Sequence, residues 1–258
     1  MNARTTALSA LIAIRRQNAW ADGALKDYAA RDRRRDAALA ARLLYGVVQN
    51  CMLLDFYLAQ AVSSPLAKLQ PVVLDILRLG AYQILFLDKI PVSAAVNEAV
   101  EQTKTYANKR AAGLVNGSLR TLARRRDELI QPHDLATRYS HPQPLVDCLR
   151  ASMDDETLEA FLAADNDIPK TALQVNPLKA APEQVAAALD EAGVAYEPHP
   201  WLHGCFLVSG TGNLEALPLF QSGAVYVQDA AAKLAVLASG AAPGMRVLDC
   251  CAAPGGKS

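Results

Sequence analysis

The sequence predicts a multidomain protein of the α and α/β classes, in which an all-helical domain precedes two parts that mix helices and strands. Three observations carry this prediction. Apolar side chains recur at helical spacing through the first 130 residues, whereas residues 171–208 alternate like short strands around one helix. Residues 245–258 then read as a buried strand, a glycine turn and the opening of a helix, which is how a Rossmann-like fold begins.

We expect four segments along the 258 residues, a length that suits about two domains with cores of their own. Because the sequence stops at Ser258, before the helix after the glycine turn could form, we expect the last domain to be truncated. The segments are the helical domain at 1–130, a linker at 131–144, a small α/β module at 145–222 and the start of the Rossmann-like domain at 223–258.

The helical domain is predicted to be a bundle around residues 74–86. That segment is apolar on nearly every side, as expected of a central helix. Gly80 within it indicates close approach of a neighbouring helix, because glycine otherwise costs stability in a helix interior. Apolar stripes for the surrounding helices occur at residues 8–15, 39–48, 95–103 and 114–122.

In the linker, His141 has the chemistry of a catalytic base, but its position beside Pro142 favours a turn residue.

The small module is predicted to be ferredoxin-like or RRM-like. A strand at 171–176, an amphipathic helix at 183–191 and short strands near residues 195 and 206 support it. In an RRM-like sheet, aromatic side chains on adjacent central strands stack RNA bases. Only Phe206 and Tyr196 could do so here.

Positive charge is concentrated in the first half of the chain, although the formal net charge is zero. Residues 1–130 contain 19 Lys and Arg against 11 Asp and Glu, and residues 131–258 contain 7 against 15. This asymmetry favours a polyanionic partner such as RNA, and solvated helix faces remain the alternative. The candidate RNA-binding residues are Arg31, Arg33, Arg34, Arg35, Arg120, Arg124, Arg125 and Arg126. The second of these two clusters also suits the C-terminal end of a helix by itself.

The five cysteines show no C-x-x-C spacing, which indicates a reducing compartment and argues against disulfides or a zinc site. No uncharged apolar run reaches the roughly 18 residues that a membrane span needs. We therefore expect a cytoplasmic monomer with no metal and no membrane partner.

Three stretches of the helical domain resemble the NusB type of RNA-binding domain. They are ARLLYGVV at residues 41–48, LRLGAYQILFLDKIPVSAAVNEAV at 77–100 and AGLVNGSLR at 112–120. The chain as a whole is similar to RNA cytosine-5 methyltransferases of the RsmB/NOP family that carry such a domain at their front. The resemblance implies a 16S ribosomal RNA substrate and S-adenosyl-L-methionine as cofactor.

The end of the sequence resembles the cofactor loop of that family. Glycines there would let backbone N–H groups approach the cofactor, and the positive end of the following helix would face its anionic part. A P-loop is the rival interpretation, but the strict pattern needs glycine where Cys251 stands. The loop residues implied to bind the cofactor are Cys251, Ala252, Ala253, Pro254, Gly255, Gly256 and Lys257. Upstream, VYVQDAAAK at residues 225–233 resembles the family's strand followed by Gln-Asp, with alanine where serine is usual.

In that family a cysteine thiolate adds to carbon 6 of cytosine, and a second cysteine assists product release. Those cysteines lie in Thr-Cys-Ser and Pro-Cys-Ser segments, and neither segment occurs in this sequence. We therefore nominate no catalytic residue, and we expect residues 1–258 to be inactive alone. The alternative function is that of a non-catalytic NusB-like RNA-binding protein in transcription antitermination, which would need neither the glycine loop nor Gln228-Asp229.

Overall fold

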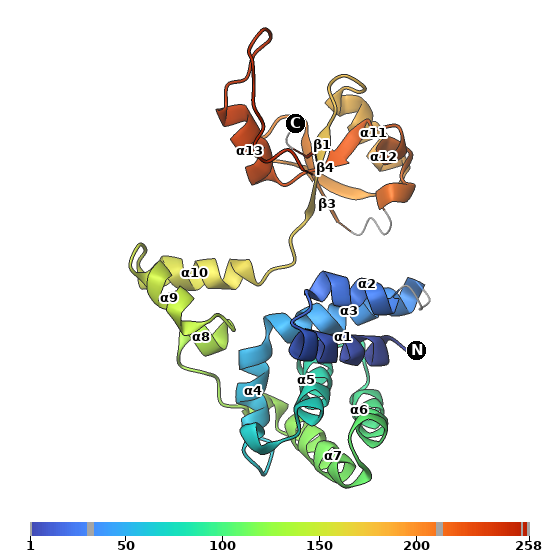
Figure 1. The fold of residues 1–258 in the computed structure, drawn as a ribbon, viewed down its shortest axis with the longest axis vertical. Helices are drawn as coiled ribbons and strands as arrows, with labels where there is room; N and C mark the ends of the chain where they lie inside the picture. Colours follow the sequence, from blue (N-terminus) through green and yellow to red (C-terminus); the bar gives the residue numbers. More distant parts are fainter. Residues whose placement is uncertain (1, 30–33, 210–213, 254, 257–258) are drawn as a thin grey trace. The chain divides into compact units, whose positions relative to one another are not determined.

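The computed structural model describes the chain except residues 1, 30–33, 210–213, 254 and 257–258, and only the backbone of residues 27–29 and 34–36 (Figure 1). The chain forms two compact units, Met1–Asp167 and Ile168–Ser258.

The first unit is entirely helical. Asn2 and Asn108 cap two of its helices by accepting hydrogen bonds from the backbone N–H groups of Thr5 and Ala111, which would otherwise be unpaired. The helices are α1 (Ala3–Gln17), α2 (Ala21–Ala29), α3 (Arg34–Gln49), α4 (Cys51–Ala59), α5 (Pro71–Phe86), α6 (Val92–Tyr106), α7 (Lys109–Arg124), α8 (Leu135–Arg138), α9 (Gln143–Arg150) and α10 (Asp155–Asp165).

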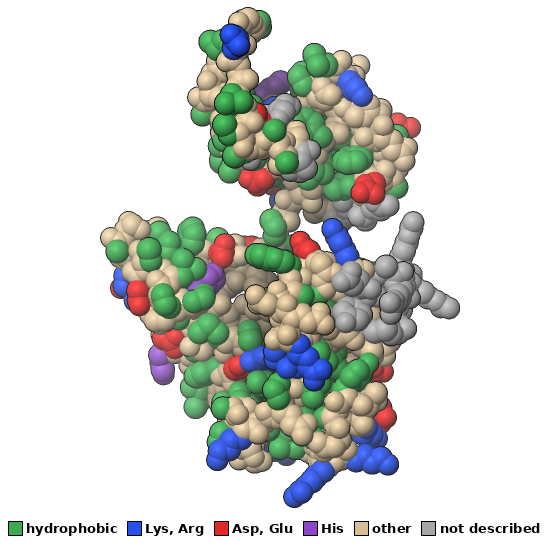
Figure 2. Space-filling view, in the orientation of Figure 1, with side chains coloured by type: hydrophobic (Ala, Val, Ile, Leu, Met, Phe, Trp, Pro, Cys, Tyr) green, Lys and Arg blue, Asp and Glu red, His purple; other side chains and the backbone are tan. Residues whose placement is uncertain are grey.

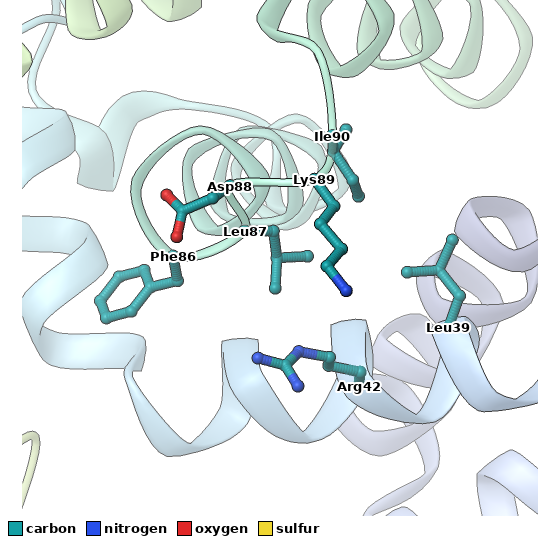
Figure 3. Close-up of a pocket in the computed structure, with 7 residues that line it drawn as sticks. All are labelled: Leu39, Arg42, Phe86, Leu87, Asp88, Lys89 and Ile90. Carbon is teal, nitrogen blue, oxygen red and sulfur yellow. The ribbon is translucent and has the colours of Figure 1, made fainter.

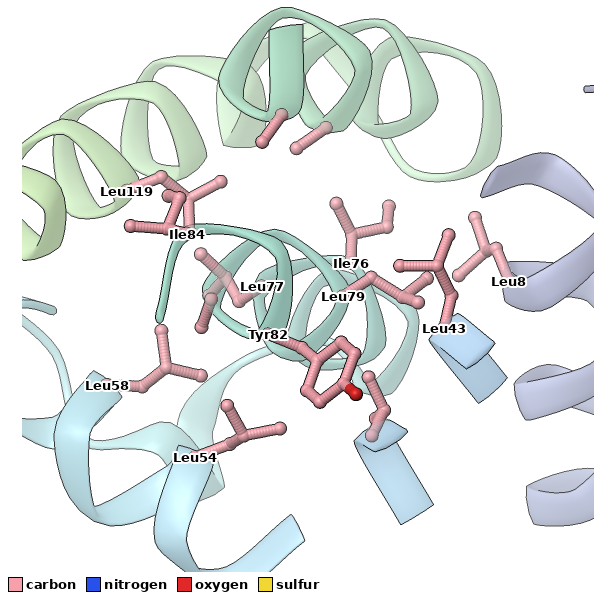
Figure 4. Packing of buried hydrophobic residues seen from close by; sticks show 14 of the residues in the cluster. Leu8, Leu43, Leu54, Leu58, Ile76, Leu77, Leu79, Tyr82, Ile84 and Leu119 are labelled. Carbon is pink, nitrogen blue, oxygen red and sulfur yellow. The ribbon is translucent and has the colours of Figure 1, made fainter. Parts of the chain in front are cut away.

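Helix α5 is the centre of this unit, as the sequence predicted. It packs against α1, α3, α4, α6 and α7. Its side chains Ile76, Leu77 and Leu79 are almost completely buried, and they point in different directions from the helix axis (Figure 4). Because α5 is apolar on nearly every side, each neighbouring helix covers a different part of it.

Two glycines permit the closest helix contacts. A Cβ atom at Gly80 would overlap the Leu119 side chain of α7, which confirms the close approach predicted there. A Cβ atom at Gly46 in α3 would overlap the ring of Tyr82 in α5, and that ring is stacked on Phe86 at 5.2 Å between centroids.

One carboxylate of α5 is itself buried. Asp75 accepts a hydrogen bond of 3.0 Å from Nε of Arg15 in α1. Arg78 lies 3.8 Å from Asp75 and makes two bonds of 2.7 and 2.6 Å to Asp55 of α4. Burial raises the pKa of Asp75, and the neighbouring arginines oppose that shift. The group therefore ties α1, α4 and α5 together.

The segment expected to be a linker folds with the helices that follow it. Helices α8, α9 and α10 share a small apolar cluster, and the Ser140 hydroxyl accepts a hydrogen bond from the Leu53 amide of α4. His141 is buried, with Nδ1 2.8 Å from the Tyr139 carbonyl and Nε2 2.9 Å from Asp165. Its ring connects a turn to α10, in agreement with the prediction that His141 is a turn residue. The compact boundary lies after Asp167, later than the predicted start of the α/β module.

The second unit contains a four-stranded antiparallel sheet in the order β2-β3-β1-β4. The β-α-β-β-α-β connectivity is ferredoxin-like, as predicted. Strand β4 pairs with β1 through Gln174 and Tyr226, so it belongs to this sheet and not to a following domain. The elements are β1 (Thr171–Val175), α11 (Pro182–Glu191), β2 (Ala195–Pro198), β3 (Cys205–Ser209), α12 (Pro218–Gln221), β4 (Val225–Val227) and α13 (Ala230–Ala238).

The prediction that Phe206 and Tyr196 could stack RNA bases is wrong. Both lie on the sheet face that α11 covers, where Phe206 is 6% exposed and the two rings meet edge to face at 5.4 Å. The alternation of strand side chains placed them with Leu173 and Val185 in the core.

The predicted buried strand at the end of the chain is also wrong. Residues 245–249 form no strand, and Val247 and Leu248 are 68% and 86% exposed. A parallel strand needs a neighbouring strand and covered faces. Among the described residues, no strand pairs with this segment, and these two side chains stay largely uncovered.

The substitution Gly46→Ala is expected to lower the free energy of unfolding by about 1–3 kcal/mol, because the new methyl group must displace the stacked Tyr82 ring. Gly113→Ala in α7 is the matched control. Its Cβ would have nothing within 4 Å, and removing a helical glycine should raise stability by about 0.5–1 kcal/mol. Urea unfolding followed by circular dichroism measures both. Equal shifts in the two variants would contradict the close packing of α3 on α5.

Candidate functional site

The two described glycines of the predicted cofactor loop line a cavity of about 540 Å³ in the second unit. Gly255 has a φ of +106°, a conformation that residues with a Cβ rarely adopt. At Gly256 a Cβ would meet nothing within 4 Å, so its backbone is open to a ligand. The other cavity residues are Asn176, Pro177, Leu178, Tyr226, Val227, Gln228, Lys233 and Val236.

The remaining loop residues are placed differently. Cys251, Ala252 and Ala253 are exposed and do not line this cavity. Pro254 and Lys257 lie outside the described residues. The structure thus brings the glycines, but not the start of the loop, against β4 and α13.

Gln228 connects the sheet to the glycine loop. Its main chain bonds to β1, accepting from Nε2 of Gln174 at 3.2 Å and donating to the Ala172 carbonyl at 3.2 Å. Its side-chain Nε2 donates to the carbonyl of Gly256. The residue is 7% exposed, and its side-chain Oε1 is buried without a hydrogen-bond partner among the described residues. A buried acceptor without a donor is costly, so this atom fits a ligand that carries N–H or O–H groups.

A cation also lines the cavity. Lys233 of α13 bonds to the Tyr226 hydroxyl at 3.2 Å and could meet an anionic ligand group. Asp229, by contrast, accepts from the Ala231 amide at 2.8 Å and caps α13. Of the Gln-Asp pair noted in the sequence, Gln228 therefore lines the cavity and Asp229 caps a helix.

Neither Cys51 nor Cys205 is activated as a nucleophile by its surroundings. Burial raises the pKa of the Cys51 and Cys205 thiols, which keeps both protonated at neutral pH. The other three, Cys148, Cys250 and Cys251, are exposed. Within the described part of the chain, no three His, Cys, Asp or Glu side chains form a group that could hold a metal ion.

The predicted arginines of the first unit have different surroundings. Arg125 donates to the Gln60 carbonyl at the end of α4, and Arg126 donates to the Leu85 carbonyl near the end of α5, each at 3.1 Å. Arg126 also lies 3.5 Å from Asp88. These two arginines therefore neutralise helix C-termini.

Arg120 and Arg124 are more available. Both are exposed; as far as the described residues show, the side chain of Arg120 bonds only to Asn116 one turn earlier, and that of Arg124 makes no polar contact. Of the first cluster, Arg31 and Arg33 lie outside the described residues, and only the backbone of Arg34 and Arg35 is described, at the start of α3. Figure 2 shows Lys and Arg side chains spread over one face of this unit.

Sequence reasoning missed a second cavity, of about 490 Å³, between α3 and the connection from α5 to α6. Arg42 and Lys89 both extend into it (Figure 3). Each is a single cation within an apolar stretch, so only the fold brings them together.

No single helix in the described residues is both long and apolar enough to cross a membrane, although the bent pair Ala37–Gln49 and Cys51–Ala59 has the length and composition for a broken span.

Comparison with known proteins matches both folded units. The model of the NusB family matches residues 1–124, and that of the RsmF/B-like methyltransferase ferredoxin-like domain matches residues 141–215. The crystal structure of PH0851 has the same fold, with a TM-score of 0.67 and 22% identity over 98% of this chain and 59% of its own.

Curated relatives extend the similarity to the whole chain. It is 34% identical over 263 residues to the "Probable ribosomal RNA small subunit methyltransferase B" of Bacillus subtilis, covering 99% of this chain and 58% of the relative. It is also 34% identical over 261 residues to the ribosomal RNA small subunit methyltransferase B of Vibrio cholerae, covering 100% of this chain and 59% of the relative. The chain thus spans less than two thirds of the length of these relatives.

The helix-end role of Arg126 predicts that Arg126→Gln lowers the free energy of unfolding by about 0.5–1 kcal/mol, since the charged donor to the Leu85 carbonyl is removed. Arg124→Gln, two residues away, removes the same charge but no bond and should change stability by less than about 0.5 kcal/mol. Urea midpoints under identical conditions compare them. If Arg124→Gln lowered stability more than Arg126→Gln, the helix-end role would not belong to Arg126.

Proposed function

The chain belongs to the RsmF/B-like methyltransferase family, and from this membership we propose that it forms the RNA-binding and cofactor-loop part of an S-adenosyl-L-methionine-dependent 16S ribosomal RNA cytosine-5 methyltransferase. The observation that carries the proposal is the joining, in one chain, of a NusB-type helical unit, an RsmF/B-type ferredoxin-like unit and a glycine loop against a cavity.

The cofactor would be held by the loop Cys251–Lys257 together with two residues from the sheet side of the cavity. The main chain of Gly255 and Gly256 would lie along it, as the open space at Gly256 allows. The unpaired Oε1 of Gln228 would accept from an ammonium or hydroxyl group, and Lys233 would face a carboxylate. When bound, S-adenosyl-L-methionine supplies the methyl group.

The helical unit would supply most of the affinity for RNA. Arg120 and Arg124 are exposed and therefore suited to phosphates, as are Arg31, Arg33, Arg34 and Arg35 by sequence. Arg125 and Arg126 already bond to main-chain carbonyls, which reduces their expected share. We further propose that the protein acts in the cytoplasm, because its substrate would be ribosomal RNA.

Deleting the gene in its source organism should remove one 5-methylcytosine from 16S ribosomal RNA. Mass spectrometry of nuclease fragments of that RNA detects the change. Restoring residues 1–258 alone should leave the cytosine unmethylated, because these residues contain neither the Thr-Cys-Ser nor the Pro-Cys-Ser segment. An unchanged set of methylated cytosines after deletion would refute the enzyme and favour a NusB-like binding protein.

The double substitution Arg120→Gln/Arg124→Gln should weaken binding of 16S RNA fragments severalfold and flatten its dependence on salt, because phosphate contacts release counterions. Filter binding at several salt concentrations measures both quantities. Lys170→Gln/Arg150→Gln is the charge-matched control, since these cations pair with Glu197 and Asp155. Equal weakening in both double variants would mean that only net charge matters.

A further inference from the structure

We propose that the cavity between α3 and the α5–α6 connection binds a backbone phosphate and the adjacent base of single-stranded RNA. The inference rests on the proposed RNA substrate and assigns it a site in the helical unit. We call this cavity the α3–α5 pocket; its lining residues are Leu39, Arg42, Phe86, Leu87, Asp88, Lys89 and Ile90.

Two cations from separate elements converge on the α3–α5 pocket. Arg42 extends from α3, and Lys89 extends towards it from the turn after α5 (Figure 3). Both side chains are exposed, and neither makes a hydrogen bond or ion pair with the described residues. A guanidinium offers a phosphate two parallel donors, and an ammonium adds a point charge. The pair is therefore free to hold an anion.

The acidic and dipolar groups at the pocket are already compensated. Asp88 is the one carboxylate among its described lining residues, and Arg126 lies 3.5 Å from it. The C-terminal end of α5 would repel an anion, but Arg126 also donates to the Leu85 carbonyl there. Among the described side chains, those of Arg42 and Lys89 consequently keep charges that no carboxylate cancels.

The rest of the α3–α5 pocket is apolar. Leu87 is buried, whereas Leu39, Phe86 and Ile90 are half-buried and present carbon to the cavity. A hydrated free anion gains nothing from such a surface. A nucleotide in a single strand does, because its base is unstacked and can lie on apolar and aromatic side chains while its phosphate meets the cations. In a duplex the bases are stacked away, so single-stranded RNA is the better occupant.

The double substitution Arg42→Gln/Lys89→Gln tests this site. With the 258-residue protein and a labelled single-stranded RNA of about 12 nucleotides, fluorescence anisotropy should show roughly tenfold weaker binding. The slope of log affinity against log salt should also fall by about 0.7 for each phosphate that the variant no longer neutralises. Lys104→Gln/Arg138→Gln removes two cations that pair with Glu101 and Glu159, at 2.6 and 2.8 Å, and should keep most of the affinity.

Three results would overturn the proposal, and they are distinguishable. If the wild-type chain binds no RNA, the proposed substrate fails together with the pocket. If it binds RNA and the two double variants weaken binding equally, the RNA substrate stands and the pocket is wrong. If millimolar inorganic phosphate binds only where Arg42 and Lys89 are intact while RNA binding is unchanged in their absence, the site holds a free anion. Single Lys89→Gln, expected to lose part of the affinity, serves as an independent check should the double variant fail to fold.

Discussion

The helical unit depends on one constraint, which is that α5 has no side that tolerates water. Ile76, Leu77 and Leu79 point in different directions and are all buried, so five helices must surround this one segment. Asp75, a charge of α5 that faces inward, is matched by Arg15 and Arg78 from the same assembly. The covering stops where α5 ends at Phe86. The α3–α5 pocket lies at this end of α5. There the connection from α5 to α6 and the facing part of α3 leave apolar side chains half-covered beside Arg42 and Lys89.

The parts of the fold that could be predicted are those whose cause is local in the sequence. An all-round apolar helix and a glycine within it, Gly80, identified the centre of the bundle and its closest contact correctly. The destination of a short strand is not local. Val225–Val227 has the same alternation whether it joins the ferredoxin-like sheet or opens another, and only its pairing with β1 decides. Val247 and Leu248 likewise have the composition of a buried strand, but in the described residues no partner strand covers them.

The candidate site could be predicted only in part, for a related reason. The glycine loop is a contiguous motif, so the sequence indicated it. In the sequence, Gln228 was notable only as part of the Gln228-Asp229 pair. Its candidate role comes from a buried oxygen that no described donor reaches, and a sequence does not show this property. The sequence indicated the clustered Arg125 and Arg126, but in the structure they bond to main-chain carbonyls. Arg42 and Lys89 are far apart in the sequence, and only the fold places them at one pocket.

Gln228 also gives the small unit a mechanical property. Its main chain is bonded into the sheet through β1, and its side chain is bonded to the loop at Gly256. Ordering of the loop and stability of the sheet are consequently coupled. Any molecule that occupies the loop adds its binding free energy to the folding of the whole unit. With a ligand on the loop, the sheet then unfolds at a higher temperature and exchanges its amide hydrogens more slowly, by an amount that grows with the logarithm of the ligand concentration.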